Sequence, residues 1–280
     1  MKKSPRIAIS LGASFMGYAT HAGFMARLHS LGVRPAAIAG SSAGAITAGL
    51  YAAGLGQEAI RAAVLSPRLY LSFAKGTRWV WHQFVRAHQD AHPGFLDAQG
   101  AVRYFESFVG RRDIASLASP KLMIALSDLK NAETLFASRG PLATAMAASA
   151  CVPMMFSPIE FDGRQCTDGG VAHETPVDPW FTDDDVDHII IHRIDQPPGR
   201  PPIMLHGRLL ATIFASRDSM GRQIMADRLR LAEIHGKKVT VITTEHARPT
   251  PLYPKGLEKR YALGEATAQK LYDEHLATLV

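Results

Sequence analysis

Gly40-Ser41-Ser42-Ala43-Gly44 is the stretch that decides how the rest of this sequence is interpreted. A short apolar run at residues 36–39 precedes it, and a longer apolar run at residues 45–53 follows it. A serine between two glycines on a turn from strand to helix is typical of a nucleophile elbow. Gly40 and Gly44 leave room for the strained backbone of such a turn. The pattern therefore makes Ser42 the first candidate for chemistry, at a helix N-terminus where free N–H groups stabilise negative charge.

A second motif, Cys166-Thr167-Asp168-Gly169-Gly170, lies far along the chain. It follows a run rich in small residues, Ala147-Ala148-Ser149-Ala150-Cys151-Val152-Pro153. On its own, Asp168-Gly169-Gly170 is typical of a β-turn in a hairpin. A serine hydroxyl becomes a good nucleophile only when a neighbouring base takes its proton, and a carboxylate can do so. Asp168 is therefore the candidate base for Ser42, with a plain turn as the alternative interpretation.

These motifs, in this order, give a sequence that resembles the patatin-like phospholipase family. The resemblance begins at the strand pattern at Ile7, includes Gly12 and the elbow, and ends at Pro176 after Asp168-Gly169-Gly170. It implies a Ser-Asp dyad without histidine, with Ser42 as nucleophile and Asp168 as base. It also implies hydrolysis of lipid esters, with no metal and no cofactor.

The turn after the first strand departs from the family pattern. Family members usually carry Gly-Gly-Gly-x-Arg-Gly, whereas this chain has Gly12-Ala13-Ser14-Phe15-Met16-Gly17. An oxyanion hole needs backbone N–H groups and no particular side chain. We therefore expect Gly12, Ala13 and Ser14 to supply these groups. The missing glycines and arginine leave a second hypothesis open, a catalytically weak lipid-binding or regulatory protein with the same fold.

His173 follows Asp168 closely and suggests a Ser-His-Asp triad. A histidine five residues beyond its supposed aspartate partner is more often a loop or capping residue. We therefore leave His173 out of the predicted site.

The periodicity of the apolar residues predicts an α/β fold, a three-layer α/β/α sandwich around a mostly parallel sheet. Continuous β-branched runs, as in His188-Ile189-Ile190-Ile191-His192, are typical of strands covered on both faces. In such sheets ligands bind at the carboxyl ends of the strands, where the turn at Gly12 and the elbow both fall. The predicted strands are residues 6–11, 36–39, 121–127, 134–137, 188–192 and 239–242, and the predicted helices are residues 19–31, 45–53, 142–148, 205–234 and 265–279.

The chain of 280 residues has no break in composition, so we expect one domain over residues 1–280 with a lid or cap inserted at about 66–100. Trp79 and Trp81 lie among cations in residues 66–96. Each aromatic side chain there can be core, but together with lysine and arginine they are typical of an element at a membrane interface.

The net charge of +6 and the pI near 9.4 favour anionic partners. The basic residues are scattered and no nucleic-acid-binding motif is present, so we expect a lipid ester substrate, contact with an anionic membrane surface and no nucleic acid. The apolar run near the N-terminus is short and fits a strand better than a signal peptide. With two cysteines, Cys151 and Cys166, a disulfide framework is not expected. We expect a cytoplasmic protein; the sequence leaves its oligomeric state open.

Overall fold

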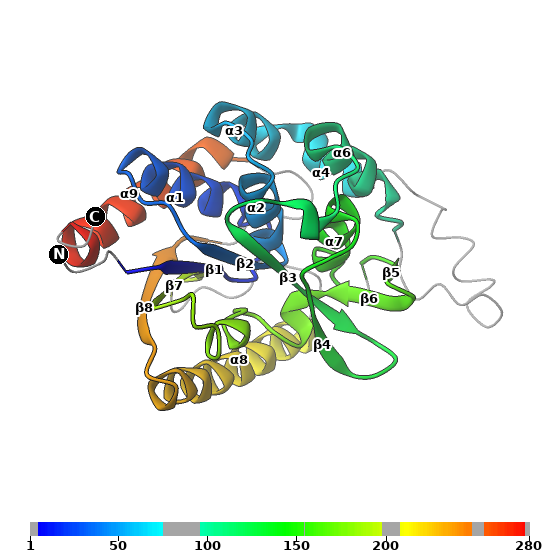
Figure 1. Cartoon of the computed structure of the whole chain (residues 1–280). Helices are drawn as coiled ribbons and strands as arrows, with labels where there is room; N and C mark the ends of the chain where they lie inside the picture. Colours follow the sequence, from blue (N-terminus) through cyan, green and yellow to red (C-terminus); the bar gives the residue numbers. More distant parts are fainter. Residues whose placement is uncertain (1–4, 75–95, 154, 198–207, 248–254, 278–280) are drawn as a thin grey trace, which may run out of the picture.

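The described part of the chain contains a sheet of eight strands (Figure 1). The computed structural model describes residues 5–74, 96–153, 155–197, 208–247 and 255–277. The strand order is β5-β6-β3-β2-β1-β7-β8, and β4 pairs with β3 outside this path. Strands β3, β2, β1, β7 and β8 run parallel, while β4 and β6 pair antiparallel with β3 and β5 pairs antiparallel with β6. The strands are β1 Ile7–Leu11, β2 Ala37–Ser41, β3 Lys121–Asp128, β4 Glu133–Ala137, β5 Ile159–Phe161, β6 Arg164–Asp168, β7 His188–Asp195 and β8 Lys238–Glu245.

Helices cover both faces of this sheet. In Figure 1, α8 lies below the sheet and the other labelled helices lie above it. Alternate residues of β1 pack on opposite faces: Ile9 belongs to the larger hydrophobic core, and Ala8 packs in the smaller core with Trp180 and Met225 of α8. The predicted three-layer α/β/α arrangement is confirmed. The helices are α1 Tyr18–Ser30, α2 Ala43–Ala52, α3 Gln57–Leu65, α4 Pro67–Ala74, α6 Gln99–Val109, α7 Leu142–Ser149, α8 Arg208–Ile234 and α9 Leu257–Leu271.

The hairpin near Asp168 differs from the sequence interpretation. The turn is formed by Asp162 and Gly163, both of which have positive φ, and it joins β5 to β6. Asp168 instead ends β6 and precedes a short 3-10 turn, Gly169–Val171. Both stretches contain Asp-Gly, the pair that tolerates positive φ at both central positions of a two-residue hairpin turn, and the structure uses Asp162-Gly163 for that turn. The interpretation of Asp168-Gly169-Gly170 as a hairpin turn is therefore wrong.

Part of the predicted insertion at 66–100 is described. Helix α4 and the first residues of α6 belong to it, whereas Trp79 and Trp81 lie outside the described residues. Both cysteines are buried free thiols.

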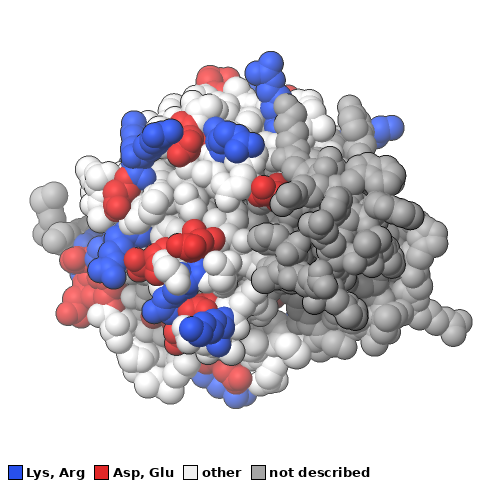
Figure 2. Space-filling view, turned by 90° about the vertical axis from the view of Figure 1, so that its right-hand side faces the viewer, with Lys and Arg blue, Asp and Glu red and all other residues white. Residues whose placement is uncertain are grey.

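Charged side chains of both signs share the described part of the surface. Figure 2 shows Lys and Arg interspersed with Asp and Glu there. Ion pairs between side chains of opposite sign occur among the described residues, such as Arg164 with Glu133 at 2.9 Å. On the described part of this face, the excess positive charge does not gather into one large patch.

Candidate active site

Ser42 lies on a strained turn between β2 and α2. Its φ of 54° and ψ of −120° are unusual for a residue with a side chain. The two glycines of the motif make the turn sterically allowed. A Cβ at Gly40 would stand 2.5 Å from the carbonyl carbon of Gly44, and a Cβ at Gly44 would stand 2.1 Å from the carbonyl oxygen of Leu11. The elbow therefore packs directly on the end of β1.

The Ser42 hydroxyl donates a hydrogen bond to Asp168, with 2.7 Å between Oγ and Oδ2. The other carboxylate oxygen of Asp168 accepts the backbone N–H of Gly170 at 2.7 Å. The Asp168 carbonyl oxygen accepts the hydroxyl of Ser127 at 2.9 Å. Gly169 permits this approach, because a Cβ there would stand 2.1 Å from the carbonyl oxygen of Ala125. The structure thus brings together two residues that are 126 positions apart, at a site where both are more than nine-tenths buried.

Ser149 holds the elbow in place, a contact that the sequence interpretation missed. Its hydroxyl oxygen accepts the backbone N–H of Ser42 at 2.9 Å and donates to the carbonyl oxygen of Ala125 at 2.7 Å. One hydroxyl therefore ties the strained turn to the last residue of α7 and to β3. The segment Ala148-Ser149 was part of the family resemblance, but no spacing in the sequence indicated its contact with Ser42.

In the loop after β1, two of the three backbone N–H groups predicted to form the oxyanion hole donate to other backbone carbonyl oxygens. The N–H of Gly12 donates to the carbonyl oxygen of His192 at 3.1 Å, and the N–H of Ala13 donates to that of Glu174 at 2.7 Å. The N–H of Ser14 has no acceptor among the described residues, and Ser14 lines the same pocket as Ser42. Gly12 and Ala13 therefore anchor the loop in this structure, and Ser14 is the member of the predicted set whose amide is open.

Helix α2 offers a second open amide. Ala43 is its first residue, and its N–H has no acceptor in the described part of the chain. The first N–H groups of a helix lack partners within the helix and lie at the positive end of its dipole. The amides of Ser14 and Ala43 thus belong to residues that line the same pocket.

His173 lies away from the dyad. Its Nε2 lies 2.8 Å from Oδ2 of Asp178, and Arg228 of α8 donates from Nε to the other oxygen of that carboxylate at 3.0 Å. Burial lowers the pKa of His173, and the neighbouring Asp178 only partly offsets this effect. The cluster ties the loop after Gly170 to α8, a structural role in keeping with the exclusion of His173 from the predicted site.

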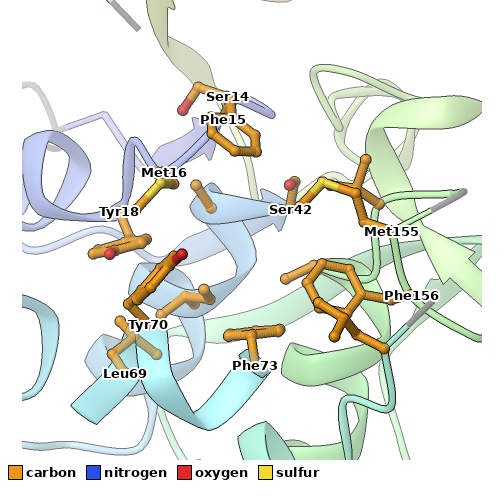
Figure 3. A pocket seen from close by; sticks show the side chains of 15 residues that line it. Ser14, Phe15, Met16, Tyr18, Ser42, Leu69, Tyr70, Phe73, Met155 and Phe156 are labelled. Carbon is orange, nitrogen blue, oxygen red and sulfur yellow. The ribbon is translucent and has the colours of Figure 1, made fainter. Parts of the chain in front are cut away.

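An apolar pocket opens beside Ser42 (Figure 3). The ring of Phe15 points toward Ser42, and Phe73 and Phe156 lie on the opposite side (Figure 3). Phe73 contributes from α4, so part of the predicted insertion forms the wall. The polar side chains in this lining are hydroxyls. The pocket is lined by Ser14, Phe15, Met16, Tyr18, Ser42, Ala43, Ile46, Leu69, Tyr70, Phe73, Leu96, Ala150, Val152, Met155 and Phe156.

Among the described residues, no cluster of three or more His, Cys, Asp or Glu side chains is arranged to hold a metal ion. In the same residues, no helix is both long and apolar enough to span a membrane.

Comparison with known proteins finds a matching family, similar sequences and a similar fold. Residues 9–180 match the sequence profile described as patatin-like phospholipase. Proteins of Mycobacterium bovis and Mycobacterium tuberculosis, each described as an uncharacterized NTE family protein, are 34% identical over 178 residues. The match covers 63% of this chain and 46% of each relative, so the chain matches about half the length of these relatives. The crystal structure of VipD from Legionella pneumophila shares the fold, with a TM-score of 0.59 at 12% identity over 98% of this chain and 67% of VipD.

Proposed function

Because the chain belongs to the patatin-like phospholipase family, we propose that it hydrolyses lipid esters with Ser42 as nucleophile and Asp168 as base. The observation that carries the proposal is the 2.7 Å hydrogen bond from Ser42 Oγ to Asp168 Oδ2 beside an apolar pocket. The pocket suits an acyl chain, since its lining is almost entirely apolar.

The reaction follows from this geometry in two halves. Ser42 Oγ attacks the ester carbonyl carbon while Asp168 accepts the hydroxyl proton, and the carbonyl oxygen becomes an oxyanion. The C–O bond to the alcohol then breaks, and the alcohol leaves with the proton from Asp168. Water attacks the acyl-enzyme in the second half, with Asp168 again accepting and returning the proton. The carboxylic acid and free Ser42 are the products.

We assign the oxyanion contacts to the backbone N–H groups of Ser14 and Ala43. They are open donors on residues that line the same pocket as Ser42, and the dipole of α2 favours negative charge at Ala43. Removal of one such donor typically lowers turnover by about 10² to 10³. The roles predicted for Gly12 and Ala13 become those of anchors that hold Ser14 in position.

A fluorophosphonate probe tests the proposal. The wild-type protein should be labelled at Ser42 and should hydrolyse a soluble short-chain ester. Ser42→Ala should lose both properties, and Asp168→Asn should lose nearly all turnover with the same circular dichroism spectrum. The double variant should be no slower than the slower single variant, because residues that act as one unit do not contribute additively. Near-normal turnover in Asp168→Asn would refute the dyad.

The engaged amides of Gly12 and Ala13 favour a second candidate function, lipid binding without turnover. That candidate predicts no labelling of the wild type, together with saturable binding of a fluorescent fatty acid that Phe73→Trp perturbs. Labelling of Ser42 with turnover of the ester excludes it.

We also propose contact with an anionic membrane surface through α4. Leu71 on α4 is 48% exposed, next to the pocket residue Tyr70, and the chain carries a net charge of +6. Sedimentation with vesicles should increase with anionic lipid content and decrease with salt, since charge is screened over about 10 Å at 0.1 M ionic strength. Leu71→Glu should weaken sedimentation and spare hydrolysis of a soluble ester. Vesicle binding that changes neither with salt concentration nor in the Leu71→Glu variant would contradict this contact.

A further inference from the structure

Two fully buried histidines, His21 and His192, contact the loop that carries Ser14. His21 of α1 has its Nε2 2.9 Å from the carbonyl oxygen of Gly12, and His192 of β7 has its Nδ1 3.0 Å from Nδ1 of His21. The carbonyl oxygen of His192 accepts the N–H of Gly12 at 3.1 Å. The ring of His192 stacks on Phe24, with 3.9 Å between ring centroids. The dyad chemistry described above uses neither histidine.

The hydrogen bonds dictate which nitrogen of each ring carries the proton. A carbonyl oxygen can only accept, so Nε2 of His21 must carry hydrogen and donate to Gly12. A neutral His21 then has a bare Nδ1, which must accept from a protonated Nδ1 on His192. The remaining nitrogen of His192, Nε2, is bare in turn and lies 2.9 Å from the hydroxyl oxygen of Thr244, which also lies 2.7 Å from the hydroxyl oxygen of Thr267.

Both rings are neutral in this arrangement. Burial lowers the pKa of His21 to about 3, and burial together with His21 and His246 keeps the pKa of His192 well below its usual value. The groups that face the pair are the Thr244 hydroxyl, the Phe24 ring and, from the C-terminal end of β8, His246, whose Nε2 bonds the Thr20 hydroxyl. No carboxylate among the described residues contacts either ring, so nothing there would stabilise a proton on the pair.

The histidine pair contacts the peptide group between Gly12 and Ala13. The carbonyl oxygen of Gly12 and the N–H of Ala13 belong to the same peptide group. His21 holds its oxygen at 2.9 Å, and the carbonyl oxygen of Glu174 holds its N–H at 2.7 Å. With this plane fixed at both ends, only φ and ψ of Ala13 separate it from the next peptide plane, whose N–H is that of Ser14.

We propose that His21 and His192 are positioning residues for the oxyanion hole: the relay from His192 through His21 to Gly12 aims the Ser14 N–H at the reacting carbonyl. The inference rests on the proposed function, because it assigns the pair a part in that reaction. The relay holds one side of the loop that carries Ser14, through the carbonyl oxygen of Gly12. Within the relay, His192 donates to His21 and His21 donates to Gly12, so both hydrogen bonds are directed toward the loop. Successive hydrogen bonds of this kind strengthen one another.

Kinetics of three variants test the proposal, with His188 as the matched control. His188 lies on the same strand as His192, is also buried, and bonds a threonine of β8, Thr240, at 2.8 Å. It makes no contact with Gly12 in the structure. His21→Phe should lower kcat on a soluble ester by about tenfold or more with little change in KM, because the group lost acts on the oxyanion. His21→Gln, whose amide can still donate to Gly12, should recover most of kcat. His188→Phe should lose stability and keep kcat.

The outcomes separate this proposal from a purely structural role. Equal losses of kcat in His21→Phe and His188→Phe would overturn it, as would a His21→Gln protein as slow as His21→Phe. If His21→Phe does not fold, the comparison of His21→Gln with wild type decides, and a tenfold loss there refutes the relay.

Nuclear magnetic resonance of the wild type tests the relay without any turnover. With ¹⁵N-labelled histidine at pH 7, His21 should carry its proton on Nε2 and His192 on Nδ1. The Ser14 amide resonance should shift in His21→Phe more than in His21→Gln or His188→Phe. The opposite tautomers, or an unmoved Ser14 amide, refute the inference. A wild type that shows the predicted tautomers yet neither binds the probe nor hydrolyses ester instead refutes the proposed function.

Discussion

At the scale of single residues, the site depends on hydroxyl and amide groups whose partners come from distant positions. Ser149 shows this dependence, because among the described residues its hydroxyl is the acceptor for the amide of Ser42. The Ser42-Asp168 pair could be predicted from the sequence because both residues stand in short motifs with glycines. Ser149 and His21 could not be assigned, since nothing in a single sequence indicates which backbone group a buried polar side chain will meet.

Ser149→Ala should lower both stability and turnover. The change leaves the N–H of Ser42 and the carbonyl of Ala125 without their partner in a buried site, and each unsatisfied group costs about 1–3 kcal/mol. Urea unfolding and kcat on a soluble ester measure the two effects. Ser107→Ala is the control, since Ser107 makes a comparable bond to Tyr104 on the exposed side of α6. A Ser149→Ala protein as active as the Ser107→Ala protein would contradict the anchoring role.

At the scale of elements, strand and helix positions followed from the apolar pattern. The predicted strand at 121–127 and the structure's β3, Lys121–Asp128, nearly coincide. Helices α3 and α6 were missed, although their buried residues recur at helical spacing, as Ala101, Phe105 and Val109 do in α6. The predicted helix at 265–279 begins earlier, at Leu257, after Gly256 with φ of 74°. Helix starts without a side-chain cap, such as this one, give little signal in the sequence.

The elbow glycines join three elements, β1, β2 and α2, so Gly44→Ala should displace α2 from β1. A Cβ there would stand 2.1 Å from the backbone of Leu11, and that backbone cannot move without disturbing the loop that follows it. We expect a loss of several kcal/mol in the free energy of unfolding and of most labelling by the fluorophosphonate probe. Gly56→Ala should be nearly neutral, because nothing lies within 4 Å of a Cβ there. Thermal melting and probe labelling of both variants check this, and equal melting temperatures would contradict it.

At the scale of the whole molecule, the core contains several histidines that are neutral when folded. Burial lowers the pKa of His21 to about 3 and that of His188 to about 4, both below the ordinary 6.5. As pH falls below 6.5 the unfolded chain therefore binds protons that the folded chain does not, and stability decreases with acid. The carboxylates with lowered pKa, such as Asp187 at about 2, titrate outside this window.

We therefore expect the free energy of unfolding to fall steadily from pH 6.5 to pH 4.5, by about 1.4 kcal/mol per pH unit for each such histidine. Urea unfolding at intervals across this range measures the slope. His188→Gln removes one of these groups and should make the slope shallower while lowering stability at pH 7. A slope that is the same in both proteins would show that His188 does not contribute.

The ladder between β3 and β6 gives the site a further property. Asp168 reaches Ser42 only when it pairs with Leu126, because a slip of one residue along β6 would turn its side chain to the other face of the sheet. Labelling of Ser42 by the fluorophosphonate probe should therefore measure the fraction of molecules in which β3 and β6 pair in the native register, rather than the fraction that is compact. During refolding, labelling should recover only as the antiparallel pairing of β3 with β6 forms. A chain trapped in the wrong register should not be labelled, even when its helix content equals that of the native protein.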